Sequence, residues 1–416
     1  MKKILNNEDW LAFLAGILII LLAWAGLFFQ SPKFNWTDSE SFLKLFTLST
    51  NLAGIAGLLL ILVTAGVLTN FLRKKKSSLL LLTILVVFSL GLLSQWISGY
   101  KPIRTYGFEY VIFALLSGIF IRSVFGLPKW IEENLHSEFF IKTGLVILGS
   151  GVIFGDIMKA GSLGLIQAVI VVLAVWFFAF WISKKLKVDD EMAMMLSSAV
   201  SICGVSAAIA TAGAIKGDGK KLSYVVSLVL IVALPMLVLL PLAAKYMGLS
   251  PAQAGAWVGG TIDTSGAVVA SGTLLGDEAL KFSTIVKFSQ NVLIGFAAVA
   301  ISVFWIFRGR KTAQKGQDEK VNFGIIWERF PKFVLGFLAA SLIFSFLVRP
   351  EAVAATKDYL KTVQTSFFAF AFVGIGLETD LSVLLKTGNG RPAWAFIIAQ
   401  FFNILFTLLV AYFLFG

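Results

Sequence analysis

The chain has 416 residues, of which 58% are hydrophobic and only 14% are charged, and its mean hydropathy is +0.89. This composition excludes an ordinary water-soluble domain and predicts an all-α integral membrane protein whose main partner is the lipid bilayer. The net charge of +12 does not indicate a nucleic-acid partner, because Lys and Arg gather in the cytoplasmic loops of membrane proteins and no basic patch with interleaved aromatic residues is present.

Side chains for metal or nucleophile chemistry are scarce. The chain has one cysteine, Cys203, and one histidine, His136, which lies in a polar stretch. A single cysteine excludes an intramolecular disulfide and a multi-cysteine metal site. We therefore expect no metal centre and no organic cofactor, and we interpret Cys203 as a small packing residue rather than a nucleophile.

The first apolar run, residues 11–29, resembles a secretory signal peptide, and residues 23–25 resemble a cleavage site. We favour a retained first helix, because Glu8 and Asp9 directly precede the apolar run and many more runs follow it. The second run, residues 45–72, ends in a basic cluster at residues 73–76 that is typical of the cytoplasmic side. This cluster places the N-terminus in the cytoplasm.

Starting from that basic cluster, the later apolar runs are expected to cross the membrane in alternating directions. A helix needs about 20 residues to cross a bilayer, and the lengths of these runs are comparable. They are residues 79–96, 111–125, 141–154, 163–182, 222–242, 282–307, 333–348, 366–385 and 393–415. We therefore expect about ten transmembrane helices.

Two segments interrupt this pattern with small and hydroxyl side chains, residues 196–215 and 257–275. A shift of sixty residues pairs Ile202 with Ile262, and several further positions match under the same shift. In both copies a small-residue segment, a polar turn and an apolar helix follow one another. The two segments are therefore expected to be copies of one structural unit.

The first small-residue segment is expected to enter the membrane and return. A full crossing would place Lys216, Lys220 and Lys221 outside, whereas a hairpin keeps them in the cytoplasm, as the positive-inside rule favours. Each arm needs about 10 residues, since half of a roughly 30 Å core is covered at about 1.5 Å per residue. We expect two re-entrant hairpins or broken helices, although two full crossings would satisfy the basic loop at Arg308 equally well.

A second similarity relates residues 146–161 to residues 372–388, each containing a Gly-x-Gly stretch and each followed by an apolar helix. The assigned orientations make both pairs of copies opposite in the membrane, although the order of the elements differs between the two halves. Inverted repeats are typical of secondary transporters with a site near the midplane. Asp156, Glu378 and Asp380 follow the two glycine stretches, where capping or solvation is the favoured role. The glycines are expected to admit close backbone approach beside the hairpins.

Four stretches carry a resemblance to the sulfate-exporter family of bacterial multi-pass membrane proteins. They are SSAVSICGVSAAIA from Ser197, GGTIDTSGAVVASG from Gly259, IVKFSQN from Ile285 and GIGLETDLSVLLKTGNGRP from Gly374. Their order and spacing extend the resemblance from about residue 110 to the C-terminus. The resemblance implies that residues 1–78 are additional N-terminal helices of a longer branch and that residues 79–416 form the transporter core. Many relatives carry His-Glu where this chain has Asp263-Thr264, and Gln and Arg where it has Ala267 and Gln290.

The tips of the two hairpins are the expected binding site. A broken helix leaves backbone N–H groups unpaired, and the positive end of each half-helix favours an anion. The candidate ligands are Ser201, Gly204, Ser206, Thr261, Thr264, Ser265 and Gly266. The alternative is that small residues only let helices pack closely.

Asp263 is the sharpest single candidate, because a carboxylate inside a small-residue transmembrane segment is costly and usually functional. We expect it to bind a coupling ion, either sodium or a proton, or to recognise a cationic group; the alternative is a charge at the membrane edge. Lys287 and Asn291 share one helical face, with Gln290 beside them. Lys287 is expected to pair with Asp263 or with the substrate anion, or else to snorkel from the nearby helix start.

These features predict a secondary active transporter of a small sulfate-, sulfonate- or carboxylate-like anion in the bacterial inner membrane. It is expected to work by alternating access, of which an elevator-like movement of the hairpin domain is one form, and a homodimer is compatible with this. An anion channel is the nearest alternative. An intramembrane enzyme is less favoured, because no histidine base lies within the membrane and no Gly-x-Ser-x-Gly elbow occurs. A receptor or scaffold is weaker still, since no soluble domain is attached.

Overall fold

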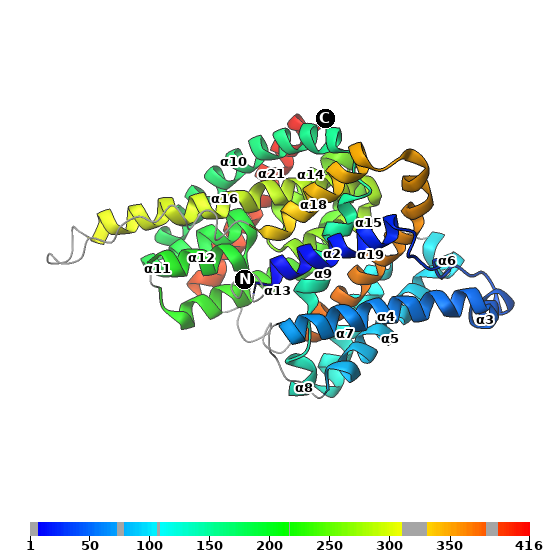
Figure 1. Ribbon diagram of the computed structural model, residues 1–416. Helices are drawn as coiled ribbons and strands as arrows, with labels where there is room; N and C mark the ends of the chain where they lie inside the picture. Colours follow the sequence, from blue (N-terminus) through cyan, green and yellow to red (C-terminus); the bar gives the residue numbers. More distant parts are fainter. Residues whose placement is uncertain (1–6, 73–78, 106–108, 216, 310–330, 380–389) are drawn as a thin grey trace. The chain divides into compact units, whose positions relative to one another are not determined.

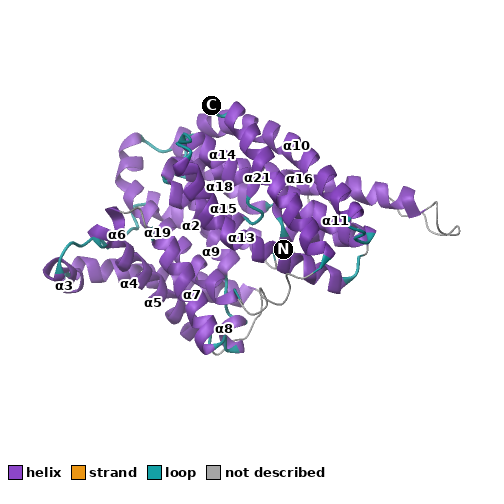
Figure 2. Ribbon diagram, turned by 180° about the vertical axis from the view of Figure 1, so that it is seen from behind, coloured by secondary structure: helices purple, strands orange, loops and turns teal. Residues whose placement is uncertain are grey.

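The computed structural model describes residues 7–72, 79–105, 109–215, 217–309, 331–379 and 390–416 (Figure 1). These residues form helices and loops, with no β-strand among them (Figure 2). Seven of the described helices are long and apolar enough to cross a membrane: Ser49–Phe71, Leu80–Gly99, Ile157–Lys185, Gly219–Tyr246, Asp277–Trp305, Pro350–Glu378 and Arg391–Leu414. The all-α membrane fold is therefore confirmed. The count of about ten crossings stays a prediction, because the remaining apolar helices are shorter.

Contacts divide the chain into two compact units. The first unit contains Met1–Asp156 and Lys332–Leu381, and the second contains Ile157–Pro331 and Ser382–Gly416. Each unit is therefore assembled from two separate stretches of chain. The predicted boundary after residue 78 concerns an added group of helices and stays a prediction.

The first unit is built around a single long helix, α19. Its helices are α2 (Glu8–Trp24), α3 (Ser39–Thr47), α4 (Ser49–Leu72), α5 (Leu80–Gly99), α6 (Lys101–Thr105), α7 (Tyr110–Phe125), α8 (Lys129–Glu132), α9 (Ser137–Gly149), α18 (Lys332–Leu342) with the π-turn η2 (Ile343–Leu347), and α19 (Pro350–Glu378). α19 packs against α5, α7 and α9, and α2 packs against α9 and α18. Phe367, Phe368, Phe370 and Phe372 are fully buried there, so bulky rings fill the centre of this unit.

Two predicted spans of the first unit have different bounds in the structure. The run at residues 45–72 is interrupted at Leu48, which has extended backbone angles between α3 and α4. The run predicted at residues 366–385 belongs to α19, which begins sixteen residues earlier, at Pro350. Charged residues at 357–361 hid this first part from a hydropathy argument, while Pro350 at the first helical position marks a normal helix start.

The second unit holds both small-residue segments. Its helices are α10 (Phe154–Lys185), α11 (Asp190–Ser198), the short π-helix η1 (Ala199–Cys203), α12 (Val205–Ile215), α13 (Gly219–Tyr246), α14 (Pro251–Thr261), α15 (Ser265–Leu275), α16 (Asp277–Gly309) and α21 (Arg391–Leu414). The residues of α10 before Ile157 belong to the first unit. α12 packs against both α13 and α16, and α15 packs against the same two helices. The two segments thus occupy matching places in the unit.

The first small-residue segment is a hairpin. A continuous helix would hold Ser198 and Val205 about 10 Å apart along its axis, yet α11 and α12 pack against each other. The Lys221 ammonium forms ion pairs with Asp189 at 2.7 Å and Glu191 at 3.1 Å. These pairs join the start of α11 to the start of α13, so the chain leaves the hairpin where it entered it.

The second small-residue segment folds back in the same way. Gly255 near the start of α14 and Gly272 near the end of α15 both pack against α16 around Ser283. The turn between the arms lies deeper along α16, because the carbonyl of Ile262 accepts a hydrogen bond from Lys287 at 2.8 Å. Both segments are therefore hairpins, as expected, while the membrane side from which each enters stays a prediction.

The start of α13 yields a pH-dependent prediction about stability. The Asp218 carboxylate accepts hydrogen bonds from the backbone N–H groups of Lys221 at 3.0 Å and Lys220 at 2.8 Å, which hold the pKa of Asp218 below its ordinary value of 3.8. A lowered pKa adds stability that is present above the ordinary value and is lost as the pH falls through the pKa of the folded state. We expect Asp218→Ala to lower the thermal unfolding midpoint at neutral pH.

The difference between the wild type and Asp218→Ala should then shrink as the pH is lowered below 3.8. Thermal unfolding in detergent across a pH series measures this difference. Asp277→Ala, at the start of α16, provides a comparison at another helix start of the same unit. A constant difference at all pH values would contradict a role for the ionised carboxylate.

Candidate functional site

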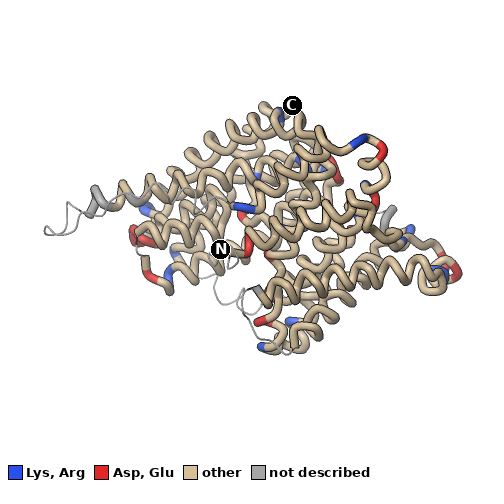
Figure 3. Tube along the Cα trace, in the orientation of Figure 1, with Lys and Arg blue, Asp and Glu red and all other residues tan. Residues whose placement is uncertain are grey.

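Charged residues lie mainly near the ends of the described helices (Figure 3). Asp263 and Lys287 are different, because their side chains are 1% and 2% exposed inside the second unit. Lys287 lies ten residues into α16, which corresponds to about 15 Å, or half of a typical roughly 30 Å hydrocarbon core. Lys287 is therefore far enough from the helix start to lie inside the membrane if α16 begins at its surface.

The two hairpin tips meet beside Lys287. Its ammonium donates hydrogen bonds to the carbonyls of Ile202 and Ile262, both at 2.8 Å. These two isoleucines are the pair that the sixty-residue shift predicts to be equivalent. Gly204 follows the first break with φ +61°, and a Cβ placed on it would lie 3.1 Å from Cβ of Asp263 in the second tip. Only a glycine fits this backbone and this contact well.

All three hydrogens of the Lys287 ammonium have acceptors. The third acceptor is Oε1 of Gln290 at 3.1 Å, and an ammonium has three donors in total. Lys287 therefore forms no hydrogen bond with Asp263, which was one of its two predicted partners. The alternative that Lys287 snorkels to the membrane surface is wrong, because its side chain is buried. The cation lies instead at the negative C-terminal ends of two half-helices, where it is electrostatically favoured.

Further side chains satisfy the other carbonyls that the helix breaks leave open. The amide of Gln290 donates to the Gly260 carbonyl at 2.8 Å, and that of Gln400 donates to the Thr261 carbonyl at 3.0 Å. The Asn403 amide donates to the carbonyls of Val200 at 3.1 Å and Thr261 at 3.2 Å. Both tips are thereby tied to α16 and α21.

The sequence interpretation missed Gln400 and Asn403. Together with Thr407, which donates to Asn403 at 2.8 Å, they form a polar stripe with helical spacing on the otherwise apolar α21. All three side chains are buried. This stripe could have indicated from the sequence that α21 contributes to the site, since buried polar groups on an apolar helix need hydrogen-bond partners.

The carboxylate of Asp263 is an unsatisfied charged group of the site. Neither Oδ1 nor Oδ2 has a hydrogen-bond partner, although the side chain is buried. Asp263 lies between the two half-helices of the second hairpin, directly before Thr264, the N-cap of α15. The side chain is therefore shielded from solvent, while the depth of Asp263 in the membrane stays a prediction. A buried carboxylate without a partner requires a ligand, a proton or a nearby positive charge.

Three more buried oxygens near the second tip also lack partners, one of which is Oε1 of Gln400. The Asn291 amide donates to Oγ of Ser265 at 3.4 Å, while its own Oδ1 has no partner. Thr261, whose carbonyl is satisfied, has an unpartnered Oγ1. With the two oxygens of Asp263, the second tip presents mainly unpartnered acceptors, together with the Thr261 hydroxyl, which can donate or accept.

The other predicted ligands are less available. Ser201 donates to the carbonyl of Ser197 at 2.7 Å, and Oγ1 of Thr264 caps the N–H of Ala267 at 3.3 Å. Ser206 is exposed in the first turn of α12, and Gly266 is buried in the first turn of α15. The amide-rich N-terminal ends of α12 and α15 nevertheless both begin at the tips, and such ends favour anions.

Close packing explains many of the remaining small residues. Cβ atoms on Gly255 and Gly259 would collide with the backbone of α16, and one on Gly260 would collide with Gln167. In the first unit, Gly149 approaches Phe337 of α18 and Gly376 approaches α7. The glycine stretches therefore admit close approach, as predicted, but their partners are helices of the first unit rather than the hairpins.

The acidic residues after the glycine stretches are only partly described. Glu378 ends α19 and accepts a hydrogen bond from Ser137 at 2.9 Å. The side chain of Asp156 and the whole of Asp380 lie outside the described residues. Glu378 thus links α19 to the start of α9, in agreement with a local structural role.

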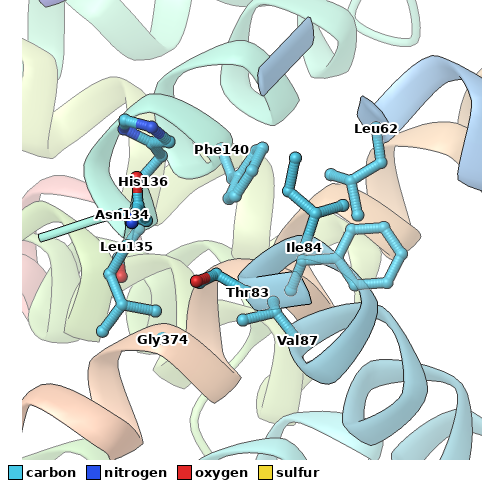
Figure 4. A pocket seen from close by; sticks show the side chains of 11 residues that line it. Leu62, Thr83, Ile84, Val87, Asn134, Leu135, His136, Phe140 and Gly374 are labelled. Carbon is cyan, nitrogen blue, oxygen red and sulfur yellow. The ribbon is translucent and has the colours of Figure 1, made fainter. Parts of the chain in front are cut away.

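A small cavity lies in the first unit between α4, α5, α9 and α19 (Figure 4). Its volume of about 10 Å³ has room for roughly one water molecule. His136, which is buried rather than exposed in a polar loop, lines it and contacts Oδ1 of Asn70 at 3.1 Å. The surrounding side chains are mostly apolar, so this cavity offers little chemistry compared with the hairpin tips.

Comparison with known proteins decides the family. A family model described as Conserved hypothetical protein 698 matches residues 80–395, which include both hairpins. The chain belongs to this family. Residues before this range lie outside the family model, and their assignment as an N-terminal addition stays a prediction. No solved structure matches the chain.

Members of the family include several UPF0324 membrane proteins. One from Rhodopirellula baltica is 38% identical over 397 residues, covering 93% of this chain and 72% of the relative. One from Nitratidesulfovibrio vulgaris is 35% identical over 341 residues, and this chain spans 58% of its length and is itself covered to 79%. One from Corynebacterium glutamicum is 28% identical, covering 77% of this chain and 87% of the relative. The chain is thus a conserved multi-pass membrane protein.

Proposed function

We propose that the protein is a secondary active transporter that moves a small anion across the bacterial inner membrane by alternating access. The anion is sulfate-, sulfonate- or carboxylate-like, and its movement is coupled to sodium or protons through Asp263. The observation that carries this proposal is the meeting of two hairpin tips at a buried carboxylate that has no partner. The N-terminus lies in the cytoplasm in this proposal.

Three features of the second unit support transport. The helices break beside the buried Lys287 of α16, and interrupted helices form the substrate and ion sites of many transporters. The N-terminal ends of α12 and α15 begin there, so their partial positive charge is available to an anion. The costly carboxylate of Asp263 is available to a coupling ion. The resemblance to sulfate exporters adds sulfate to the candidates.

Flux through proteoliposomes tests the proposal. The purified full chain is reconstituted, and labelled sulfate, a sulfonate and a dicarboxylate are offered under an imposed proton or sodium gradient. We expect one of these anions to accumulate above its external concentration and unlabelled anion on the opposite side to accelerate its exchange. An anion channel would equilibrate the anion without accumulation or acceleration. Flux no greater than that of empty liposomes under every gradient would overturn the proposal.

A further inference from the structure

The junction of the two hairpins already contains a cation. Half-helix C-terminal ends carry partial negative charge, and in many transporters such carbonyls coordinate the coupling sodium. Here carbonyls at the ends of the two half-helices, those of Ile202 and Ile262, both accept hydrogen bonds from the ammonium of Lys287 at 2.8 Å. The side chain thus occupies the place that a coordinated metal cation would take.

Backbone carbonyls beside Lys287 are already bound, and the oxygens that lack partners at the second tip belong to side chains, among them both oxygens of Asp263 and Oδ1 of Asn291. The neighbouring carbonyls of Val200, Gly260 and Thr261 are occupied by amide donors from α16 and α21. Sodium requires several oxygen ligands at once, and backbone carbonyls usually provide a large share of them. At this junction, amide and ammonium donors bind five backbone carbonyls of the two tips.

The simplest ligand for the carboxylate of Asp263 is a proton. Among the described residues, the titratable neighbours that act on it are Lys287 on α16 and Cys203 on η1. α13 presents the apolar Val229 at the tip, and α21 presents the neutral amides of Gln400 and Asn403. One proton converts this carboxylate to a neutral acid and removes the cost of burying an unpartnered charge.

We infer that Lys287 is a built-in counter-ion that fills the cation position between the two hairpin tips, so that Asp263 binds a proton and not sodium as the coupling ion. The role of Lys287 as a positioning residue follows from its three bonds alone. The coupling clause rests on the proposed function. Both parts can be examined without measuring transport.

Chemical rescue tests the counter-ion. Lys287→Ala removes the ammonium and leaves three buried acceptors open beside a space the size of the lost side chain. We expect the thermal unfolding midpoint to fall and to recover in part when methylammonium or ethylammonium is added. Tetramethylammonium, which has no N–H donor, should not restore it, and the wild type should respond to none of these ions. Lys281→Ala, on the same helix and less buried, serves as the matched control.

Ion replacement and infrared spectroscopy test whether Asp263 binds a proton rather than sodium. Exchanging sodium for choline at constant ionic strength should leave the thermal midpoint of the wild type unchanged. An infrared difference spectrum between acidic and alkaline samples should contain a component from one protonated carboxylic acid that the same difference spectrum of Asp263→Asn lacks. These measurements need no Lys287 variant, so they decide the matter even where Lys287→Ala does not fold.

Two results would overturn the inference. A folded Lys287→Ala protein that small amines do not stabilise would show that the ammonium is not a replaceable counter-ion. Stabilisation of the wild type by sodium that disappears in Asp263→Asn would place sodium at the carboxylate. Neither result would affect anion accumulation in proteoliposomes, so failure of this inference and failure of the proposed function are distinguishable.

Discussion

Replacing Asp263 by Ala is expected to abolish anion accumulation driven by an ion gradient, reducing it to the level of empty liposomes. The carboxylate is the buried acidic group at the junction of the tips, and both of its oxygens are without partners. No other described carboxylate at the tips can take over a proton or a cation. Uptake in proteoliposomes with and without the gradient measures the loss.

Asp263→Asn separates coupling from binding. The amide keeps the shape of the carboxylate but cannot take up a proton, so we expect exchange of anion down its gradient to continue while accumulation is lost. Removing an unpartnered buried charge should also leave stability unchanged or raise it by about 1–3 kcal/mol. Asp218→Asn, the same change at an exposed helix cap of the same unit, is the control. Full accumulation by Asp263→Ala would contradict the assignment.

A side chain at Gly204 is expected to damage both stability and transport. The residue has φ +61°, and a Cβ on it would lie 2.6 Å from Val229 and 3.1 Å from Asp263. Backbone strain of this kind costs about 1–3 kcal/mol, and the collision adds to it because α13 and the second tip must both move. We therefore expect Gly204→Ala to lower the thermal midpoint strongly and Gly204→Val to lower it further.

Two controls separate strain from collision at Gly204. Gly248 also has a positive φ, of +65°, but a Cβ on it would have no atom within 4 Å, so Gly248→Ala measures strain by itself. Adding Val229→Ala to Gly204→Ala opens space and should restore the part of the loss that comes from the collision. Equal midpoints for Gly204→Ala and Gly248→Ala would show that the contact between the tips is unimportant.

Much of the fold follows from local sequence properties. Long apolar runs indicate membrane helices because each unpaired polar group in hydrocarbon is costly, and this argument holds without knowledge of packing. The sixty-residue shift also identified equivalent positions, since Ile202 and Ile262 accept hydrogen bonds from the same ammonium. Helix bounds were less accurate where charged residues lie within a helix, as in the first part of α19.

The sequence by itself determined the membrane class and predicted two small-residue hairpins and a role for Asp263, because composition, spacing and a misplaced charge are visible along the chain. The tertiary structure alone decided what Lys287 binds and that Gln400 and Asn403 belong to the site. Hydrogen bonds depend on direction and on a separation of about 3 Å. Residues more than eighty positions apart reach that separation only after α16 and α21 pack against both tips.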